Sequence, residues 1–263
     1  MSSPPGEESG DSGSGNPEPG RRERAPRERG DANPALLLAQ PPSRWSDAAF
    51  WPFWAGFGGA MRLWFRLRAE NRPPLGGSYV LAANHVSYLD PLLLGAVVPR
   101  RIVYMMTVTV WRSRTMGWFY RWNRTIPLAV RTANRDAMRA ARSVLQQGRL
   151  LGIFPEGGLS RDGGLLLGNP GAVALVLQEG VPIVPVGIVG AERALPVGAW
   201  WPRPCQITIR FGQPITADEL SALSQDRRIR LQLATKKIMA AIAELVGKDT
   251  RERELERLRP VPR

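Results

Sequence analysis

The sequence predicts an α/β fold in which a mostly parallel central sheet is flanked by helices, behind an N-terminal amphipathic segment. Two observations carry this prediction. After residue 70, short apolar runs alternate with segments of helical character. Strands that alternate with helices form a parallel sheet that is covered on both faces. The composition also changes abruptly near residues 42 and 70, and we find no internal repeat.

Residues 1–42 are rich in Pro, Gly, Ser and charged side chains and include the run GRRERAPRERG. They hold too few apolar side chains to offset the entropy that is lost on ordering. We therefore expect a disordered tail at 1–42, an amphipathic helical segment at 43–70, an α/β domain at 71–247 and a charged C-terminal extension at 248–263.

The amphipathic segment is aromatic, because Trp45–Ala69 contains four Trp and four Phe among its arginines. This mixture is typical of helices that lie at a lipid headgroup boundary. The uncharged part, Ala48–Met61, is too short to cross a hydrocarbon layer of roughly 30 Å and contains Pro52. We therefore expect a peripheral anchor on the cytoplasmic side of the cell membrane. The alternative is a helix packed on the core with its tryptophans buried.

The expected strands are short apolar runs that end at polar or turn residues. They cover residues 78–83, 101–108, 125–130, 150–154, 181–190 and 205–215. The expected helices cover residues 90–98, 134–148 and 172–180, and residues 219–247 form one or two terminal helices. Pro91 in the first turn and Gly148 as a stop mark helix boundaries.

The chain is strongly basic, with 36 Lys and Arg against 23 Asp and Glu and a formal net charge of +13. This surplus favours phosphate-bearing partners, whether nucleic acid, anionic lipid or phosphorylated metabolites. Most of the positive charge is Arg, which suits bidentate phosphate contacts but follows equally from a GC-rich coding sequence.

The single cysteine, Cys205, excludes an internal disulfide, and with one histidine it does not supply the usual tetrahedral zinc shell. We therefore expect no metal and no cofactor. The N-terminus shows no charged leader followed by an apolar core, so a cytoplasmic location is expected.

Polar side chains follow three of the expected strands. Asn84 and His85 follow the first, Arg131 follows the third, and the run Phe154–Gly157 follows the fourth. In a parallel sheet the loops at the carboxyl ends of the strands form the ligand crevice. The sequence therefore predicts that these residues line one site.

The sole histidine lies in the run NHVSYLD, five positions before an aspartate. On one continuous helix, residues this far apart point about 140° away from each other, so only a turn brings His85 and Asp90 together. Asp90 would then accept the imidazole N–H and leave the other ring nitrogen as a base. The alternative has Asp90 as an N-cap and His85 as a surface loop residue. Ser87 between them lacks the G-x-S-x-G context of a hydrolase nucleophile.

Three blocks in order, NHVSYLD, IFPEGGLSRDG about 70 residues later and then VPIVPVGI, resemble the glycerolipid acyltransferase family, which includes the lysophosphatidate acyltransferases with an H-x4-D motif. The similarity runs from about Leu75 to Ile215. It implies that residues 71–247 are an acyltransferase domain. The implied reaction moves a fatty acyl group from acyl-CoA or acyl carrier protein to the free hydroxyl of lysophosphatidate, giving phosphatidate.

The resemblance also implies roles for individual residues. His85 matches the general base that deprotonates the acceptor hydroxyl, and Asp90 would orient its imidazole. Arg131 matches an arginine that contacts the acceptor phosphate, and Glu156 with Gly157 implies acceptor binding.

One block departs from the family pattern. Gly158 and Leu159 stand where the family usually has Thr and Arg, and Arg161 lies two places further on. Either Arg161 reaches the same phosphate from a flexible loop, or the acceptor is different: glycerol-3-phosphate, another lysophospholipid or a glycolipid. Pro185 matches the proline of the last block, with a structural or acyl-pocket role.

Parts of the sequence are compatible with two other classes of function. Arginines interleaved with aromatic residues at 111–124 are compatible with nucleic-acid binding, but no helix-turn-helix, RRM or finger signature is present, so no nucleic-acid partner is expected. The altered third block is compatible with a catalytically inactive lipid-binding scaffold, against which the intact His85 and Asp90 argue.

Overall fold

The computed structural model describes residues 43–72, 76–114, 117–129, 134–160, 164–196, 199 and 201–248. All described residues belong to one compact unit. The expected tail at 1–42 and nearly all of the expected C-terminal extension lie outside the described residues. So do Arg131 and Arg161.

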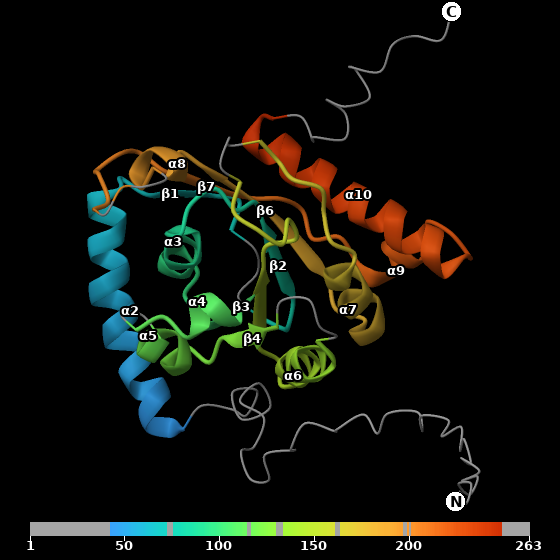
Figure 1. Cartoon of the computed structure of the whole chain (residues 1–263), viewed down its shortest axis with the longest axis horizontal. Coiled ribbons are helices and arrows are strands. Elements are labelled where there is room, and N and C mark those ends of the chain that lie inside the picture. Colours follow the sequence, from blue (N-terminus) through green and yellow to red (C-terminus); the bar gives the residue numbers. More distant parts are fainter. Residues whose placement is uncertain are drawn as a thin grey trace, which may run out of the picture. The chain divides into compact units, whose positions relative to one another are not determined.

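The described part contains a seven-stranded sheet with the strand order β1-β7-β6-β2-β5-β3-β4 (Figure 1). Its strands are β1 (Arg68–Glu70), β2 (Val80–Ala83), β3 (Ile102–Thr107), β4 (Ile126–Leu128), β5 (Leu150–Ile153), β6 (Ile183–Val189) and β7 (Thr208–Phe211). The five strands from β6 to β4 are parallel, which confirms the predicted sheet. β7 runs antiparallel to β6, and β1 pairs in parallel with β7 at the edge.

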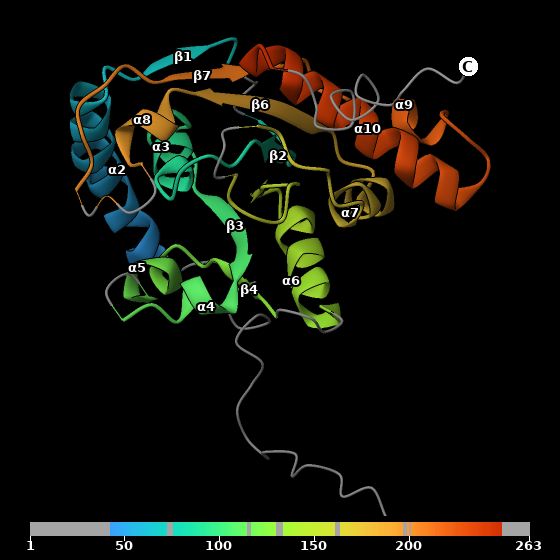
Figure 2. The same cartoon turned by 45° about the horizontal axis from the view of Figure 1, so that its top comes forward.

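Helices cover both faces of the sheet (Figures 1 and 2). They are α2 (Arg44–Trp64), α3 (Asp90–Val97), α4 (Val108–Trp111), α5 (Gly117–Trp122), α6 (Arg135–Gln146), α7 (Gly171–Glu179), α8 (Ala191–Ala194), α9 (Ala217–Ser221) and α10 (Arg227–Val246). Along β2, Val80 and Ala82 pack into the core under α6, α7 and α10, whereas Leu81 and Ala83 pack into the core under α3. Alternation along the strands thus builds a hydrophobic core on each face.

The aromatic segment forms one long helix and then an edge strand. Ser43 caps α2 by accepting a hydrogen bond from the Ser46 amide at 3.2 Å. The helix ends at Trp64, and the last residues of the segment form β1, so the expected helix over 43–70 is wrong at its end. The sequence pattern did not indicate β1 because a three-residue edge strand has too few residues to show alternation.

The inner side of α2 packs against α3. The indole N–H of Trp54 donates to the Gly95 carbonyl at 2.9 Å, and Arg62 donates to the Ala96 carbonyl. A Cβ on Gly58 would lie 3.4 Å from that same Ala96 carbonyl oxygen, so the two helices approach closely here. One side of α2 thus packs on the core, as the alternative predicted, but its tryptophans are not buried as that alternative required: Trp45, Trp51 and Trp64 are exposed.

The outward side of α2 is apolar. Its exposed residues include Trp45, Ala48, Ala49, Pro52, Ala55, Gly56, Ala60 and Leu63. Trp45 is 86% exposed and Leu63 is 83% exposed. From Trp45 to Trp64, Asp47 is the only charged side chain at an exposed position. None of the described helices is long and apolar enough to cross a membrane.

Candidate active site

The site begins where β2 leaves the sheet. The last β2–β6 backbone pair joins Ala83 to Val186, and the next residue, Asn84, continues the pairing with its side chain. Its amide nitrogen donates to the Ile188 carbonyl at 3.0 Å, and its oxygen accepts from the Ile188 amide at 2.7 Å. The buried carboxamide thus substitutes for a strand residue, and it fixes the start of the loop that carries the histidine.

His85 and Asp90 meet through the turn between β2 and α3. The imidazole Nδ1 lies 2.9 Å from Asp90 Oδ2. The same oxygen accepts hydrogen bonds from the amides of Val86 and Ser87, each at 2.8 Å. The N-cap of α3 is Leu89, and Asp90 is the first helical residue and fully buried. The alternative in which Asp90 caps the helix is therefore wrong.

The environment of Asp90 determines how the imidazole is used. Burial raises the pKa of the Asp90 carboxyl above its ordinary value, although the contacts from His85 and two backbone amides oppose this. Asp90 Oδ1 is buried and has no partner among the described residues. The carboxylate assigns the proton to Nδ1 of His85, so the lone pair of Nε2 is available as a base. A proton accepted there would be stabilised by the adjacent buried anion.

Glu156 braces the same loop from the neighbouring strand. Its Oε1 accepts from the His85 amide at 2.8 Å, and its Oε2 accepts from the Leu166 amide at 2.8 Å. The Ser160 amide donates to the His85 carbonyl at 2.8 Å, so both main-chain groups of His85 are bound. Burial raises the pKa of the Glu156 carboxyl above its ordinary value, although the hydrogen bonds from the two backbone N–H groups oppose this. Both carboxylate oxygens are thus occupied, and the expected role of Glu156 in acceptor binding stays a prediction.

Aromatic rings hold the imidazole from one side. The Phe154 ring stacks on the His85 ring with centroids 4.2 Å apart and planes at 23°. The Tyr104 ring also stacks with the Phe154 ring, with centroids 6.2 Å apart and planes at 9°, and the Tyr104 hydroxyl donates to the Pro91 carbonyl at 2.9 Å. A Cβ at Gly152 would lie 2.5 Å from the Tyr104 ring, so only glycine leaves room for this stack. Sequence reasoning missed both ring contacts, although a glycine inside a buried strand signals close packing.

A cavity of about 240 Å³ opens beside the imidazole. Its lining includes His85, Tyr104, Met106, Tyr120, Phe154 and Leu159. Gly157 and Gly158 form part of the rim, and Gly157 has a left-handed φ of 68°, which turns the chain after Glu156. Within the described wall no Lys or Arg is present, and Leu159 lies where the family pattern has an arginine.

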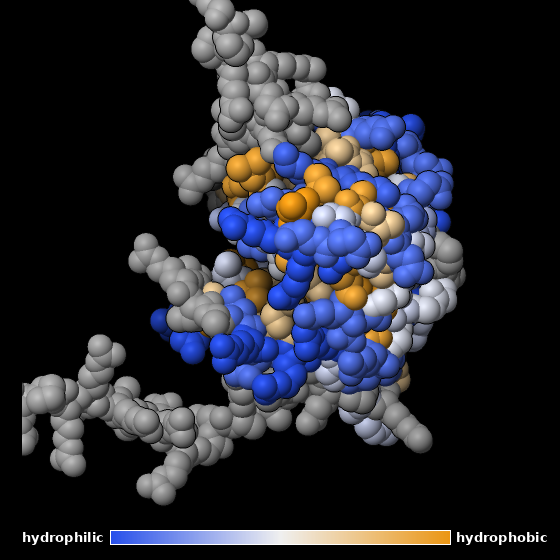
Figure 3. Space-filling view, turned by 90° about the vertical axis from the view of Figure 1, so that its right-hand side faces the viewer, coloured by the Kyte–Doolittle hydropathy of each residue, from blue (hydrophilic) through white to orange (hydrophobic). Residues whose placement is uncertain are grey.

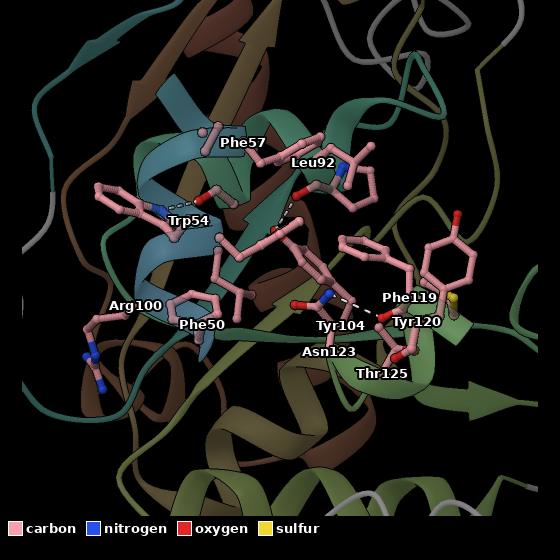
Figure 4. A pocket seen from close by; sticks show the side chains of 17 residues that line it. Phe50, Trp54, Phe57, Leu92, Arg100, Tyr104, Phe119, Tyr120, Asn123 and Thr125 are labelled. Carbon is pink, nitrogen blue, oxygen red and sulfur yellow. Dashed lines mark hydrogen bonds between the residues drawn. The ribbon is translucent and has the colours of Figure 1, made fainter. Parts of the chain in front are cut away.

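A second, apolar cavity of about 60 Å³ adjoins the first and lies between α2, α3, β3 and α5. Figure 4 shows the Phe50 and Trp54 side chains from α2 and the Tyr104 side chain from β3 around it. Both cavities are lined by Pro91, Tyr104, Met106 and Tyr120. These four side chains therefore separate the space beside His85 from an apolar space under α2.

Metal ligands do not cluster in the described part of the chain: no group of three His, Cys, Asp or Glu side chains is placed to hold an ion. Cys205 lies apart from the site with its thiol 3.7 Å from the Gly190 carbonyl oxygen. The chemistry that this geometry supports is proton abstraction by a carboxylate-oriented imidazole at the edge of a cavity.

Comparisons with known proteins relate the chain to acyltransferases. The family model described as Acyltransferase matches residues 65–189. The chain is 29% identical over 158 residues to the 1-acyl-sn-glycerol-3-phosphate acyltransferase of Limnanthes douglasii, covering 58% of this chain and 55% of that protein. It is 24% identical over 180 residues to the 1-acyl-sn-glycerol-3-phosphate acyltransferase of Bacillus subtilis (strain 168), covering 68% of this chain and 86% of that one.

A solved structure has a similar fold. The 1-acyl-sn-glycerophosphate acyltransferase PlsC from Thermotoga maritima superposes with a TM-score of 0.60 at 22% identity, covering 80% of this chain and 86% of that chain. The matched part of the chain spans only about half, 55%, of the Limnanthes douglasii relative.

Proposed function

Because the chain belongs to the glycerolipid acyltransferase family, we propose that it transfers a fatty acyl group from acyl-CoA or acyl carrier protein to the free hydroxyl of lysophosphatidate, giving phosphatidate. The observation that carries this proposal is the contact of 2.9 Å between His85 and the buried Asp90 at the edge of a cavity. The acyl donor and acceptor correspond to those that the sequence motifs imply.

In the proposed reaction His85 Nε2 takes the proton of the acceptor hydroxyl as the oxygen attacks the thioester carbonyl. Asp90 stabilises the imidazolium that forms. The tetrahedral intermediate then collapses, the carbon–sulfur bond breaks, and the thiolate leaves with the proton from the imidazolium. A thioester is already activated, so the reaction requires a base, a positioned alcohol and support for the oxyanion.

The apolar cavity under α2 supports a place for the acyl chain. It adjoins the His85 cavity and is lined mainly by apolar side chains from α2, α3 and β3. We propose that the donor chain passes the wall formed by Tyr104 and Met106 toward this space. The cavity is small, about 60 Å³, so Met106 and its neighbours must move to admit a long chain.

The outward side of α2 supports contact with a bilayer. Its exposed positions are apolar, and Trp45 stands almost fully exposed at the N-terminal end. By contrast, the side of the molecule that carries α7, α9 and α10 is mostly hydrophilic (Figure 3). We propose a peripheral position on the cytoplasmic face of the membrane with α2 at the headgroup boundary.

The test is an acceptor panel with purified full-length chain and one labelled acyl-CoA. We expect lysophosphatidate to be acylated with many turnovers per enzyme, which also excludes a stoichiometric lipid-binding scaffold. His85→Ala should abolish transfer while the circular dichroism spectrum and Tm remain close to those of the wild type. Substantial residual turnover in this variant would contradict the assigned base.

Leu159 favours a second candidate, the same acyl transfer to an acceptor without a phosphate monoester. An apolar side chain lines the cavity where the family pattern places a phosphate-binding arginine. If the acceptor is lysophosphatidate, Leu159→Arg should lower its KM, by roughly tenfold for one charge-assisted contact. Leu159→Met is the matched control for size. A fall in activity with lysophosphatidate but not with uncharged glycerolipids would indicate that the cavity accepts a neutral headgroup.

A further inference from the structure

Arginines precede three neighbouring parallel strands of the sheet. Arg149 directly precedes β5, Arg101 directly precedes β3, and Arg124 lies two residues before β4. β5, β3 and β4 are adjacent in the strand order. Because the amino ends of parallel strands meet at one edge, these positive charges gather there, at the opposite ends of the strands from His85.

A wide hollow of about 610 Å³ lies between this amino edge and the N-terminal part of α2. Arg100, Arg101 and Arg149 line it together with Asp47, Trp51 and Gln147. Arg100 is held in place, because its Nη1 donates to the Gly77 carbonyl at 2.7 Å and its Nη2 to the Gly148 carbonyl at 2.8 Å. The hollow is thus a built surface whose positions are fixed by the backbone.

Arg101 is a deeply buried cation of the hollow. Its side chain is only 7% exposed, and its guanidinium donates to the carbonyls of Trp122 and Ser46. Its Nε is buried and has no hydrogen-bond partner among the described residues. Its carboxylate neighbour, Asp47, lies 3.8 Å away with a side chain that is 56% exposed. An exposed carboxylate at this distance offsets little of a buried positive charge.

The arginines also repel one another. Burial, together with the charges of Arg124 and Arg101, lowers the pKa of Arg149 to about 10, and the carboxylate of Asp47 opposes this shift. Burial and the charge of Arg124 likewise lower the pKa of Arg101, again against Asp47. Asp47 therefore offsets only part of the positive charge of Arg101, and a hollow lined by three arginines attracts anions.

The neighbourhood of the hollow indicates what kind of anion fits. Trp51 stands at its rim, 52% exposed, on the helix whose outward side is uncharged from Trp45 to Leu63 apart from Asp47. A free phosphate would use the arginines alone. A phospholipid carries its phosphate and its acyl chains on the same glycerol, so it would use both the arginines and the apolar side of α2.

We propose that this hollow binds the phosphate of an acidic phospholipid in the bilayer surface, as a site separate from the one beside His85. The inference rests on the proposed bilayer contact of α2. It gives that contact a preference for acidic membranes, which α2 alone, with its apolar outward side, does not supply.

The experiment measures co-sedimentation of the full-length chain with vesicles of phosphatidylcholine, alone or containing phosphatidylglycerol. We expect the wild type to prefer the acidic vesicles. Removing two charges with R100Q and R149Q together should weaken binding to acidic vesicles by about 30-fold, at about fivefold per charge near an acidic surface. Binding to pure phosphatidylcholine should change little, because the apolar outward side of α2 is unchanged in this variant.

Two further variants make the test independent of folding. Arg139→Gln removes one exposed charge on α6, on the opposite face of the sheet, and should change binding by less than about twofold because the charge lies away from the bilayer. Asp47→Asn removes the opposing carboxylate and should strengthen binding to acidic vesicles by about fivefold. A gain of this kind does not arise from misfolding.

Three results would overturn the proposal. The first is a loss of binding to acidic vesicles in Arg139→Gln that is as large as the loss in the variant with R100Q and R149Q. Such a result would show a general effect of net charge. The second is no gain in Asp47→Asn. The third is release from acidic vesicles by millimolar inorganic phosphate but not by chloride of equal ionic strength, which would show a soluble phosphate ligand. The assay contains no acyl donor, so a failed acceptor panel leaves its outcome unaffected.

Discussion

At the carboxyl ends of β2 and β5 the carboxylates are buried and hydrogen-bonded, whereas at the amino ends of β3 and β5 arginines lie close enough to repel one another. Asp90 accepts three hydrogen bonds through one oxygen, and Glu156 holds two backbone amides. Arg101 and Arg149 share Asp47 as an opposing carboxylate. The same strands thus build a preorganised site at one edge and a surface lined by arginines at the other.

This difference suits one edge to the proposed chemistry and the other edge to the proposed binding of a headgroup. A base must be held in one orientation in a surrounding of low polarity, which the bonded carboxylates provide. A headgroup site benefits from charges that remain attractive to an incoming anion. The following predictions alter one edge at a time.

The largest effect is expected for Asp90→Asn. An amide in place of the carboxylate no longer enforces the Nδ1–H tautomer of His85 and no longer stabilises the imidazolium. We expect kcat to fall by on the order of a thousandfold with little change in the acceptor KM. Steady-state kinetics with lysophosphatidate measure both values. A rise in KM with an unchanged kcat would place Asp90 in binding instead.

Glu156→Gln should have a smaller effect on kcat. It distinguishes a role in holding the loop backbone from a role in binding the acceptor. The new NH₂ group faces a backbone N–H, either of His85 or of Leu166, so one amide loses its acceptor. If Glu156 is a brace, we expect kcat to fall by roughly tenfold and the Tm to drop, because an unsatisfied buried amide costs about 1–3 kcal/mol. If Glu156 contacts the acceptor, KM rises and the Tm stays near the wild-type value. Thermal melts beside the kinetics decide between the two.

The smallest expected effect lies at the amino edge, and it is a gain in stability instead of a loss. Arg124 adopts a left-handed backbone conformation with φ 57°, which is costly for a residue with a Cβ. Arg124→Gly should raise the free energy of unfolding by about 1 kcal/mol, and Arg124→Ala, which keeps the Cβ, should not. Urea unfolding of both variants measures the difference. Equal destabilisation by the two would show that the arginine side chain outweighs the backbone strain.

The sequence predicted the parts of the fold that depend on local pattern. The apolar runs around Val80, Val103 and Leu151 became central strands, and the turn before Pro91 brought His85 to Asp90. These outcomes follow from periodicity and from the steric demands of proline, which a single chain displays.

The sequence did not reveal the contacts between distant segments, because these contacts depend on the order and register of the strands. The bond from the His85 amide to Glu156 spans 71 positions and exists only because β2 and β5 are neighbours. The antiparallel direction of β7 likewise depends on how the chain returns after α8, which no periodicity specifies. The contacts of the Phe154 ring with His85 and Tyr104 depend on the space that Gly152 leaves beside the Tyr104 ring, which becomes visible only when the two strands are placed side by side.

The side chain of Asn84 has a consequence for how the protein moves. It ties the end of β2 to the Ile188 backbone, while Glu156 and Ser160 tie the next residue to the segment after β5. The loop that carries His85 therefore cannot open without breaking contacts to two neighbours at once. In hydrogen–deuterium exchange the amides of His85, Ser160 and Ile188 should exchange together as one cooperative unit, at the rate of a larger unfolding event.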